Sequence, residues 1–128
     1  MEKADVQRWM DAYVAAWKSY DRAAIEALFS DDVVYRYHPY DEPIRGRDAV
    51  VASWLGEDDN ADDSSRDEPG TYDAAYAPAA VDGDVAVAVG ASTYTQPEAV
   101  YDNCFLMRFD ADGRCSEFTE FFMKRPTK

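Results

Sequence analysis

The sequence predicts an α+β domain in which three N-terminal helices pack on a curved antiparallel sheet and enclose a pocket. Three observations support this fold class: apolar residues at helical spacing in the first third, an aromatic strand around residue 35, and two Asp-Gly turns in the second half. Helices followed by a run of strands are typical of the α+β class. The 128 residues are predicted to form one domain, 1–128, long enough to bury a core.

Two helices are predicted before the first strand. The apolar positions of the first helix recur at the spacing of one helical face, which indicates an amphipathic helix with an aromatic inner side. These positions are Val6, Trp9, Met10, Tyr13, Val14 and Trp17. Asp21 is a suitable N-cap for a second, shorter helix that directs Ile25, Leu28 and Phe29 inward. The Ser-Asp-Asp run at residues 30–32 is expected to end that helix.

A strand and a third helix are predicted next. Residues 33–37 are mostly β-branched or aromatic, and Tyr35 and Tyr37 share one face of this predicted strand. Arg36 lies on the other face, which is therefore expected to point outward. A turn bracketed by two prolines follows, and Gly46 precedes the third helix. The apolar side of that helix carries Val50, Val51, Trp54 and Leu55.

The segment 56–70 is strongly acidic, with seven acidic residues against one Arg. Like charges repel one another, so this run is predicted to be a mobile surface loop. A lid over the pocket is the other interpretation, because long loops of this kind often carry function.

The second half of the chain predicts four strands in two hairpins. The strands cover residues 72–81, 85–95, 100–109 and 114–123, with turn sequences inside each pair. If residues 110–113 form the last loop, Asn103 lies opposite Glu120 and Phe105 opposite Phe118. Their shared face is the more aromatic one and is expected to point inward.

Composition and charge argue against two kinds of partner. The formal net charge of −13 opposes binding to nucleic-acid phosphates and to anionic membranes. The longest apolar runs are too short to span a bilayer, and the polar N-terminus lacks the core of a signal peptide. The two cysteines are expected to be free thiols, which predicts a cytoplasmic location. One histidine and no CxxC pair predict no metal site.

Three short motifs resemble a known fold family. They are Leu-Phe-Ser-Asp-Asp-Val at 28–33, Glu-Pro-Ile-Arg-Gly at 42–46 and Arg-Phe-Asp-Ala-Asp-Gly-Arg at 108–114. Together with the order of elements, they resemble the NTF2-like (SnoaL-like) superfamily, which includes ketosteroid isomerases, polyketide cyclases, scytalone dehydratases and limonene epoxide hydrolases. The resemblance implies an NTF2-like cone, a pocket for a small hydrophobic molecule, a homodimer, and chemistry without a cofactor.

Ketosteroid isomerases allow a comparison residue by residue. Counted back from Asp21, Tyr13 falls where that family has its oxyanion-hole tyrosine. Tyr37, or His38 after a shift of one residue, falls where the family has its general-base aspartate. Phe105 falls where it has a protonated aspartate. Because one of the three catalytic residues is retained, the resemblance does not predict ketosteroid isomerase activity by the mechanism of that family.

The resemblance also bears on the strand at 85–95, whose inward face has two interpretations. Hydrophobicity alone would turn Val85, Val87 and Val89 inward. The family comparison turns the alternate, small residues inward and leaves room for a ligand. The small face consists of Ala86, Ala88, Gly90 and Ser92.

Glu120 is the predicted proton-transfer group. It would lie between Phe118 and Phe122 along its strand and opposite Asn103, where desolvation raises the pKa of a carboxyl group toward a useful range. A position at the sheet rim, or a structural ion pair with an arginine, is the other interpretation. Asn103 is expected to orient a substrate, unless it serves only as a hydrogen-bonded group within the sheet.

Further residues complete the predicted site. Tyr13 is expected to polarise a carbonyl or hydroxyl group together with Asn103, with assistance from Tyr37 or His38. For Tyr13 and His38, purely structural roles are the alternative. The side chains expected to contact the substrate are Trp17, Trp54, Phe105, Phe118 and Phe122.

Two classes of function follow from these residues. One is an enzyme that carries out isomerisation, dehydration or cyclisation of a small hydrophobic substrate by proton transfer. Epoxide hydrolysis of the limonene type is disfavoured, because that family uses an Asp-Arg-Asp set and Arg36 is expected to point outward. The other is a non-catalytic module for small-molecule binding or dimerisation, the latter through Val87, Leu106 and Phe121 on the outer sheet face.

Overall fold

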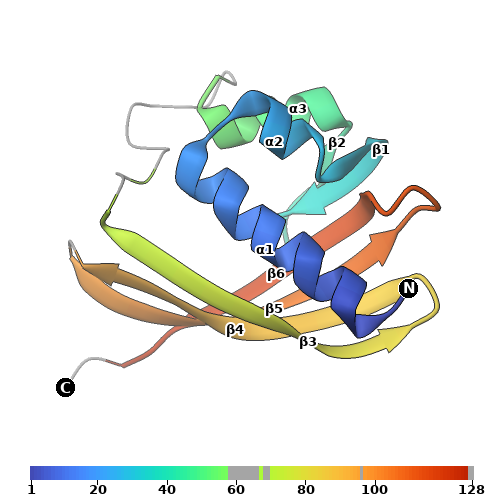
Figure 1. Cartoon of the computed structure of the whole chain (residues 1–128). Helices are drawn as coiled ribbons and strands as arrows, with labels where there is room; N and C mark the ends of the chain where they lie inside the picture. Colours follow the sequence, from blue (N-terminus) through green and yellow to red (C-terminus); the bar gives the residue numbers. More distant parts are fainter. Residues whose placement is uncertain (58–66, 68–69, 96, 127–128) are drawn as a thin grey trace.

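The computed structural model describes residues 1–57, 67, 70–95 and 97–126 and confirms the α+β class. Within this part of the chain, helices cover one face of a strongly curved, unclosed sheet of six strands (Figure 1). The helices are α1 (Lys3–Ser19), α2 (Arg22–Glu26) and α3 (Arg47–Leu55). The strands are β1 (Phe29–Arg36), β2 (Ile44–Arg45), β3 (Tyr72–Asp82), β4 (Val85–Thr95), β5 (Glu98–Phe109) and β6 (Cys115–Lys124).

The sheet is mixed, whereas a wholly antiparallel sheet was predicted. Its strand order is β2-β1-β6-β5-β4-β3, and the last four strands of the chain form the predicted antiparallel hairpins. β1 pairs in parallel with β6, with Tyr35 beside Phe118. The parallel pair joins segments more than 80 residues apart, so no turn sequence could reveal it.

The boundary between α2 and β1 differs from the prediction. Asp21 caps α2 as expected, and its carboxylate accepts a hydrogen bond from the Ala24 amide at 3.0 Å. The helix ends at Glu26, so Phe29 begins β1 and does not belong to the helix. The predicted helix end at 30–32 is wrong for the same reason, because the backbone of Leu28 already accepts a hydrogen bond from Cys115 on β6.

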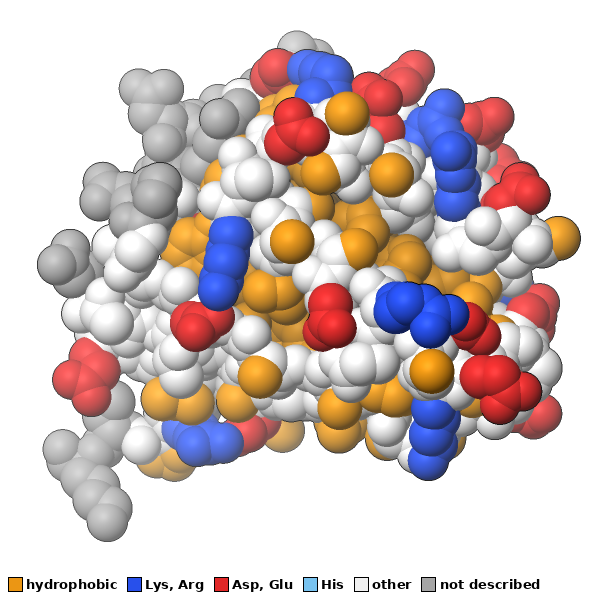
Figure 2. All heavy atoms as spheres, in the orientation of Figure 1, with side chains coloured by type: hydrophobic (Ala, Val, Ile, Leu, Met, Phe, Trp, Pro, Cys, Tyr) orange, Lys and Arg blue, Asp and Glu red, His pale blue; other side chains and the backbone are white. Residues whose placement is uncertain are grey.

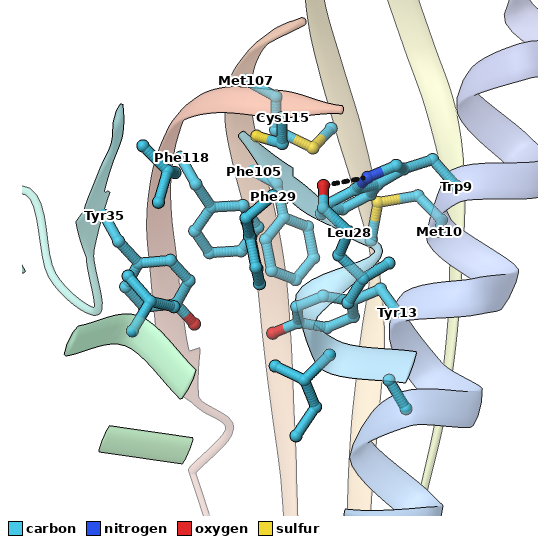
Figure 3. Packing of buried hydrophobic residues seen from close by; sticks show 14 of the residues in the cluster. Trp9, Met10, Tyr13, Leu28, Phe29, Tyr35, Phe105, Met107, Cys115 and Phe118 are labelled. Carbon is cyan, nitrogen blue, oxygen red and sulfur yellow. Dashed lines mark hydrogen bonds between the residues drawn. The ribbon is translucent and has the colours of Figure 1, made fainter. Parts of the chain in front are cut away.

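The core lies between the three helices and the concave face of the sheet, and Figure 3 shows part of it. Phe29, Phe105 and Phe118 are fully buried there. The indole of Trp9 packs among them and donates a hydrogen bond of 3.0 Å to the backbone oxygen of Leu28. Burial of such side chains is worth roughly 2 kcal/mol each, which anchors α1 on the sheet.

Strand β4 turns its small residues inward, as the family comparison implied. Ala86, Ala88 and Ser92 are at most 3% exposed, whereas Val89 is 45% exposed on the outer face. The hydrophobic pattern alone would have given the wrong face. The small face makes room for the side chains of the neighbouring strands.

The last hairpin keeps the predicted faces but not the predicted register. Glu120 pairs with Phe105 and not with Asn103, and Phe118 pairs with Met107. An irregularity between Arg108 and Phe109 shifts the pairing. Compared with the prediction, the pairing is shifted by two residues, so the same side chains still point inward. The same irregularity turns Cys115 inward, although the predicted register placed it outside.

The surface bears the expected excess of acidic groups. On the face that α1 covers, acidic and basic side chains are interspersed with hydrophobic ones (Figure 2). Most of the acidic segment 56–70 lies outside the described residues, so its predicted mobility and lid role stay predictions. In the described part of the chain, none of the helices has the length and apolar character needed to cross a membrane.

Candidate functional site

A cavity of about 510 Å³ opens beyond the core, between α1, α3 and the concave side of the sheet. Ten of its eighteen described lining residues are aromatic, and seven of those ten are tyrosines. The aromatic rings give the cavity an apolar wall, and the tyrosines add hydroxyl groups to it. This combination is typical of sites for small organic molecules.

Glu120 lies on the wall of this cavity. Its inward orientation follows from strand alternation, since Phe118 two residues earlier is fully buried in the core. Burial raises the pKa of the Glu120 carboxyl group from 4.5 to about 7. Two weaker effects lower this pKa, the hydrogen bond from Asn103 and the charge interaction with His38. Among the described residues, Glu120 forms no ion pair with an arginine, and its hydrogen bond comes from the Asn103 amide.

Asn103 links Glu120 to two further residues. Its Nδ2 donates to Glu120 Oε2 at 3.0 Å, and its Oδ1 accepts a hydrogen bond of 2.7 Å from the hydroxyl of Ser92. The Ser92 oxygen lies 2.6 Å from the hydroxyl of Tyr76. Tyr76, Ser92 and Asn103 are all at most 7% exposed and Glu120 is half-buried, so β3, β4, β5 and β6 each contribute one member to this polar chain.

Tyr13 and Tyr35 form a second polar group on the cavity wall. Their hydroxyls point toward one another (Figure 3). The Trp54 indole donates to the Tyr35 oxygen at 3.2 Å. Burial raises the pKa of both tyrosines well above 10, and the charge of Glu120 raises both further. Both hydroxyls therefore keep their protons at neutral pH.

Tyr37 and His38 occupy different places. Tyr37 lines the cavity, and its hydroxyl lies 3.0 Å from the Ser53 hydroxyl. His38 lies outside the described lining residues, where its Nδ1 is 2.8 Å from Asp41 and its ring lies 4.9 Å from that of Phe122. The structure therefore brings Tyr37 to Glu120's cavity and leaves His38 at its margin.

The residues expected to contact substrate fall into two groups. Trp17, Trp54 and Phe122 line the cavity. Phe105 and Phe118 are fully buried in the core and lie outside the described lining. They support the cavity floor from behind, since Phe118 stacks on Tyr13 at 5.6 Å and on Tyr35 at 4.6 Å.

Sequence reasoning did not assign functional roles to Tyr35, Tyr76 or Ser92. Tyr35 shares a face with Tyr37, so strand alternation alone could have placed it inward. Ser92 was already on the small face of its strand, which the family comparison turned inward. Tyr76 gave no such signal, because the pairing of its strand with the next depends on the length of the turn between them.

No metal-binding set is formed by the described residues. Groups of three His, Cys, Asp or Glu side chains suited to a metal ion are not found in the part of the chain that the structure covers. Cys104 and Cys115 are free thiols, and Cys115 is fully buried.

A model of the SnoaL-like domain family matches residues 10–118. Among solved structures, an LEH-like epoxide hydrolase from M. tuberculosis is similar, at 17% identity and a TM-score of 0.66, over 96% of this chain and 86% of that one. A protein of unknown function from Burkholderia xenovorans LB400, described as NTF-2 like, is 17% identical with a TM-score of 0.68, over 100% of this chain and 89% of that one. An NTF2-like protein of unknown function from Mesorhizobium loti is 22% identical with a TM-score of 0.65, over 94% of this chain and 93% of that one. A comparison with curated proteins gave no match.

Proposed function

The chain belongs to the SnoaL-like domain family, and from this premise we propose that it is an enzyme that moves a proton within a small hydrophobic molecule held in the cavity. The family fold supports many reactions, so the proposal rests on the site. The observation that carries it is the Glu120 carboxyl group on the wall of an aromatic cavity, with a pKa raised to about 7.

Glu120 is suited to both halves of a proton transfer. A carboxyl group with a pKa near 7 is present in comparable amounts as base and as acid at neutral pH. Its Oε2 accepts from Asn103, and no residue in the described structure bonds its Oε1. Glu120 lines the cavity, and we propose that Oε1 faces the substrate.

The Tyr13–Tyr35 pair supplies a donor for developing negative charge. The Trp54 N–H bonds the Tyr35 oxygen, and the hydroxyls of Tyr13 and Tyr35 point toward one another on the cavity wall. Their O–H groups are the donors proposed for a substrate oxygen. A donor fixed in a dry site stabilises an enolate far better than water does.

These groups together define a reaction class. Glu120 removes a proton from the carbon next to a carbonyl group, the carbonyl becomes an enolate bonded by the tyrosine pair, and Glu120 returns the proton to another atom. Isomerisation follows when the proton returns to carbon, dehydration when a hydroxyl group leaves as water, and cyclisation when the enolate attacks a second carbonyl. The chemistry is assigned to Glu120, Tyr13 and Tyr35, with Asn103 and Tyr37 beside them.

Epoxide hydrolysis, the activity named for one similar structure, is not proposed for this chain. The described residues that line the cavity include two carboxylates, Glu120 and Asp67, but no arginine. Arg36 instead donates to the backbone oxygen of Asp41 at 3.3 Å. The set expected for epoxide opening is therefore incomplete among these residues.

The experiment that tests the proposal is hydrogen exchange in deuterated water. The probes are substituted 2-cyclohexenones, and ¹H NMR measures exchange of the protons next to the carbonyl. We expect the protein to accelerate exchange, and we expect Glu120→Gln to slow it about 100-fold or more because the base is lost. Glu117→Gln, at an exposed position on the same strand, is the matched control and should leave the rate unchanged.

Two results would count against the enzyme. Equal exchange rates for the protein and Glu120→Gln would remove Glu120 from the reaction. Saturable binding of the same ketones without any exchange would favour the second candidate, a non-catalytic module for small molecules. That candidate draws on the same tyrosine-rich lining.

A homodimer formed through the outer sheet face is a separate proposal. Val89, Leu106, Phe121 and Met123 are 40–74% exposed on that face, and the register sets Val89, Cys104 and Phe121 side by side across three strands. Ion pairs of Arg108 with Asp84 and of Arg125 with Asp102 lie at its two ends. An apolar centre with mixed charges at its edges suits a second copy of the same surface.

Light scattering checks this proposal directly. We expect twice the monomer mass for the protein, and the monomer mass for Leu106→Glu, which places a charge in the centre of the contact. Ala15→Glu, on the exposed side of α1, should remain dimeric. A monomeric parent protein at about 50 μM would overturn the dimer, because contacts of a standard interface hold at that concentration.

A further inference from the structure

The polar chain that ends at Glu120 has one consistent direction. An ionised carboxylate only accepts hydrogen bonds, so the Asn103 group that faces Glu120 must be the amide NH₂. The Asn103 carbonyl then faces Ser92 and can only accept, so the Ser92 hydroxyl donates to it. With its proton used, the Ser92 oxygen accepts from the Tyr76 hydroxyl. Three donors thus point along the chain toward the carboxylate.

We infer that Tyr76 and Ser92 are positioning residues, which hold the Asn103 side chain so that its amide N–H faces Glu120 Oε2 and Oε1 is left for the substrate. The inference rests on the proposed function for its link to turnover, while the hydrogen-bond chain itself requires no substrate. Neither residue acts on the reacting atoms. Both act through Asn103, which would otherwise be free to rotate by 180° and present its carbonyl oxygen to the carboxylate.

Local packing explains why the chain forms on these strands. Tyr76 pairs with Gly90 across β3 and β4, and a Cβ at Gly90 would come within 2.0 Å of the Ala75 backbone oxygen and 2.7 Å of the Tyr76 ring. The ring of Tyr76 therefore lies over β4 where only glycine permits it. From there its hydroxyl reaches Ser92, two residues further along the same inward face.

The energetic consequence lies in the ionisation of Glu120. A hydrogen bond that favours the charged form lowers the pKa of a carboxyl group, and the Asn103 bond has that effect here. Loss of the correct amide orientation should thus raise the pKa of Glu120 by about one unit.

Other groups also face Glu120 and must be held constant in a test. Charge interactions link it to Tyr13 on α1, to Tyr35 on β1, to His38 after β1, to Tyr76 on β3 and to Tyr94 on β4. The other titratable residues of the described lining are Tyr20, Tyr37, Asp67, Tyr101 and Lys124. The variants below change none of these groups except Tyr76, which stays neutral throughout the pH range used because burial raises its pKa.

The test is a ¹³C NMR titration of the Glu120 carboxyl group, which needs no substrate. We expect Ser92→Ala to raise its pKa by about one unit and Tyr76→Phe to raise it by a smaller amount. Ser92→Thr keeps the hydroxyl and should restore the parent value. Thr93→Ala, exposed on the opposite face of β4, and Tyr72→Phe, on the same face of β3 but bonded to Trp17, are the matched controls.

A double variant separates positioning from a general loss of structure. If Ser92 acts only through Asn103, adding Ser92→Ala to Asn103→Leu should not shift the pKa of Glu120 further. An unchanged Glu120 pKa in both Ser92→Ala and Tyr76→Phe would overturn the inference, and so would an additive double variant. Failure of the proposed enzyme would appear differently, as absent hydrogen exchange with the titration shifts intact.

Discussion

The two ends of the molecule's interior are built by the same strands but differ in chemistry. At the closed end, the inward residues of β5 and β6 are Phe109, Met107, Phe105, Cys115 and Phe118, all at most 3% exposed. Further along the same inward faces, the open end carries Asn103 and Glu120. On β5 the inward side chains change from apolar to polar between Phe105 and Asn103, and on β6 between Phe118 and Glu120. A single sheet face therefore provides both the apolar core that stabilises the fold and the polar wall of the cavity.

The residues that stabilise the fold and the residues of the candidate site are therefore adjacent on the same strands. At the closed end, the inward side chains of β5 and β6 named above carry no oxygen or nitrogen atom, so their contribution is packing. The open end keeps a carboxyl group in an environment that disfavours its charge, which costs stability at neutral pH. Such a cost is typical of functional sites, where local rules of folding are broken for a chemical purpose.

The largest expected effect contrasts two phenylalanines on the same face of β6. Phe118→Ala should lower the free energy of unfolding by about 3–5 kcal/mol, because it empties a fully buried site among Tyr13, Tyr35 and Phe105. Phe122→Ala, at a side chain 39% exposed, should cost less than about 1 kcal/mol. Urea unfolding measures both. Equal losses would mean that the two ends do not differ in packing as described.

A smaller effect concerns the cost of Glu120 at the open end. Its folded pKa of about 7 lies above the ordinary 4.5, so between these values the folded protein holds a proton that the unfolded chain has lost. Stability contributed by this group is therefore present below pH 4.5 and lost as the pH rises through 7. Glu120→Gln should raise the free energy of unfolding by up to about 3 kcal/mol at pH 9 and by almost nothing at pH 4.

The control for this measurement is Glu117→Gln, an exposed carboxyl group on the outer face of the same strand. We expect this exposed substitution to change the free energy of unfolding by less than about 0.5 kcal/mol. A Glu120→Gln variant that is less stable than the parent at pH 9 would indicate that the carboxylate stabilises the fold, which contradicts an environment set by desolvation. Chemical unfolding at five or six pH values provides the comparison.

The sequence predicted a large part of this arrangement. Helical spacing placed α1 and its aromatic inner face, and Asp-Gly turns placed both hairpins. Strand alternation then identified Glu120 and Asn103 as inward neighbours, and the error of two residues in register left them on the correct face. Their roles in catalysis stay predictions until the exchange and titration experiments are done.

What the sequence by itself determined is the set of amphipathic elements and their order, because periodicity and turn residues act within a few positions. Only the tertiary structure decided the parallel pairing of β1 with β6, and with it the irregular hairpin that turns Cys115 inward, since the Cys115 amide bonds Leu28 far away in the chain. It also decided the chain from Tyr76 through Ser92 and Asn103 to Glu120. Each member lies on a different strand, and hydrogen bonds between side chains depend on registers that local sequence does not encode.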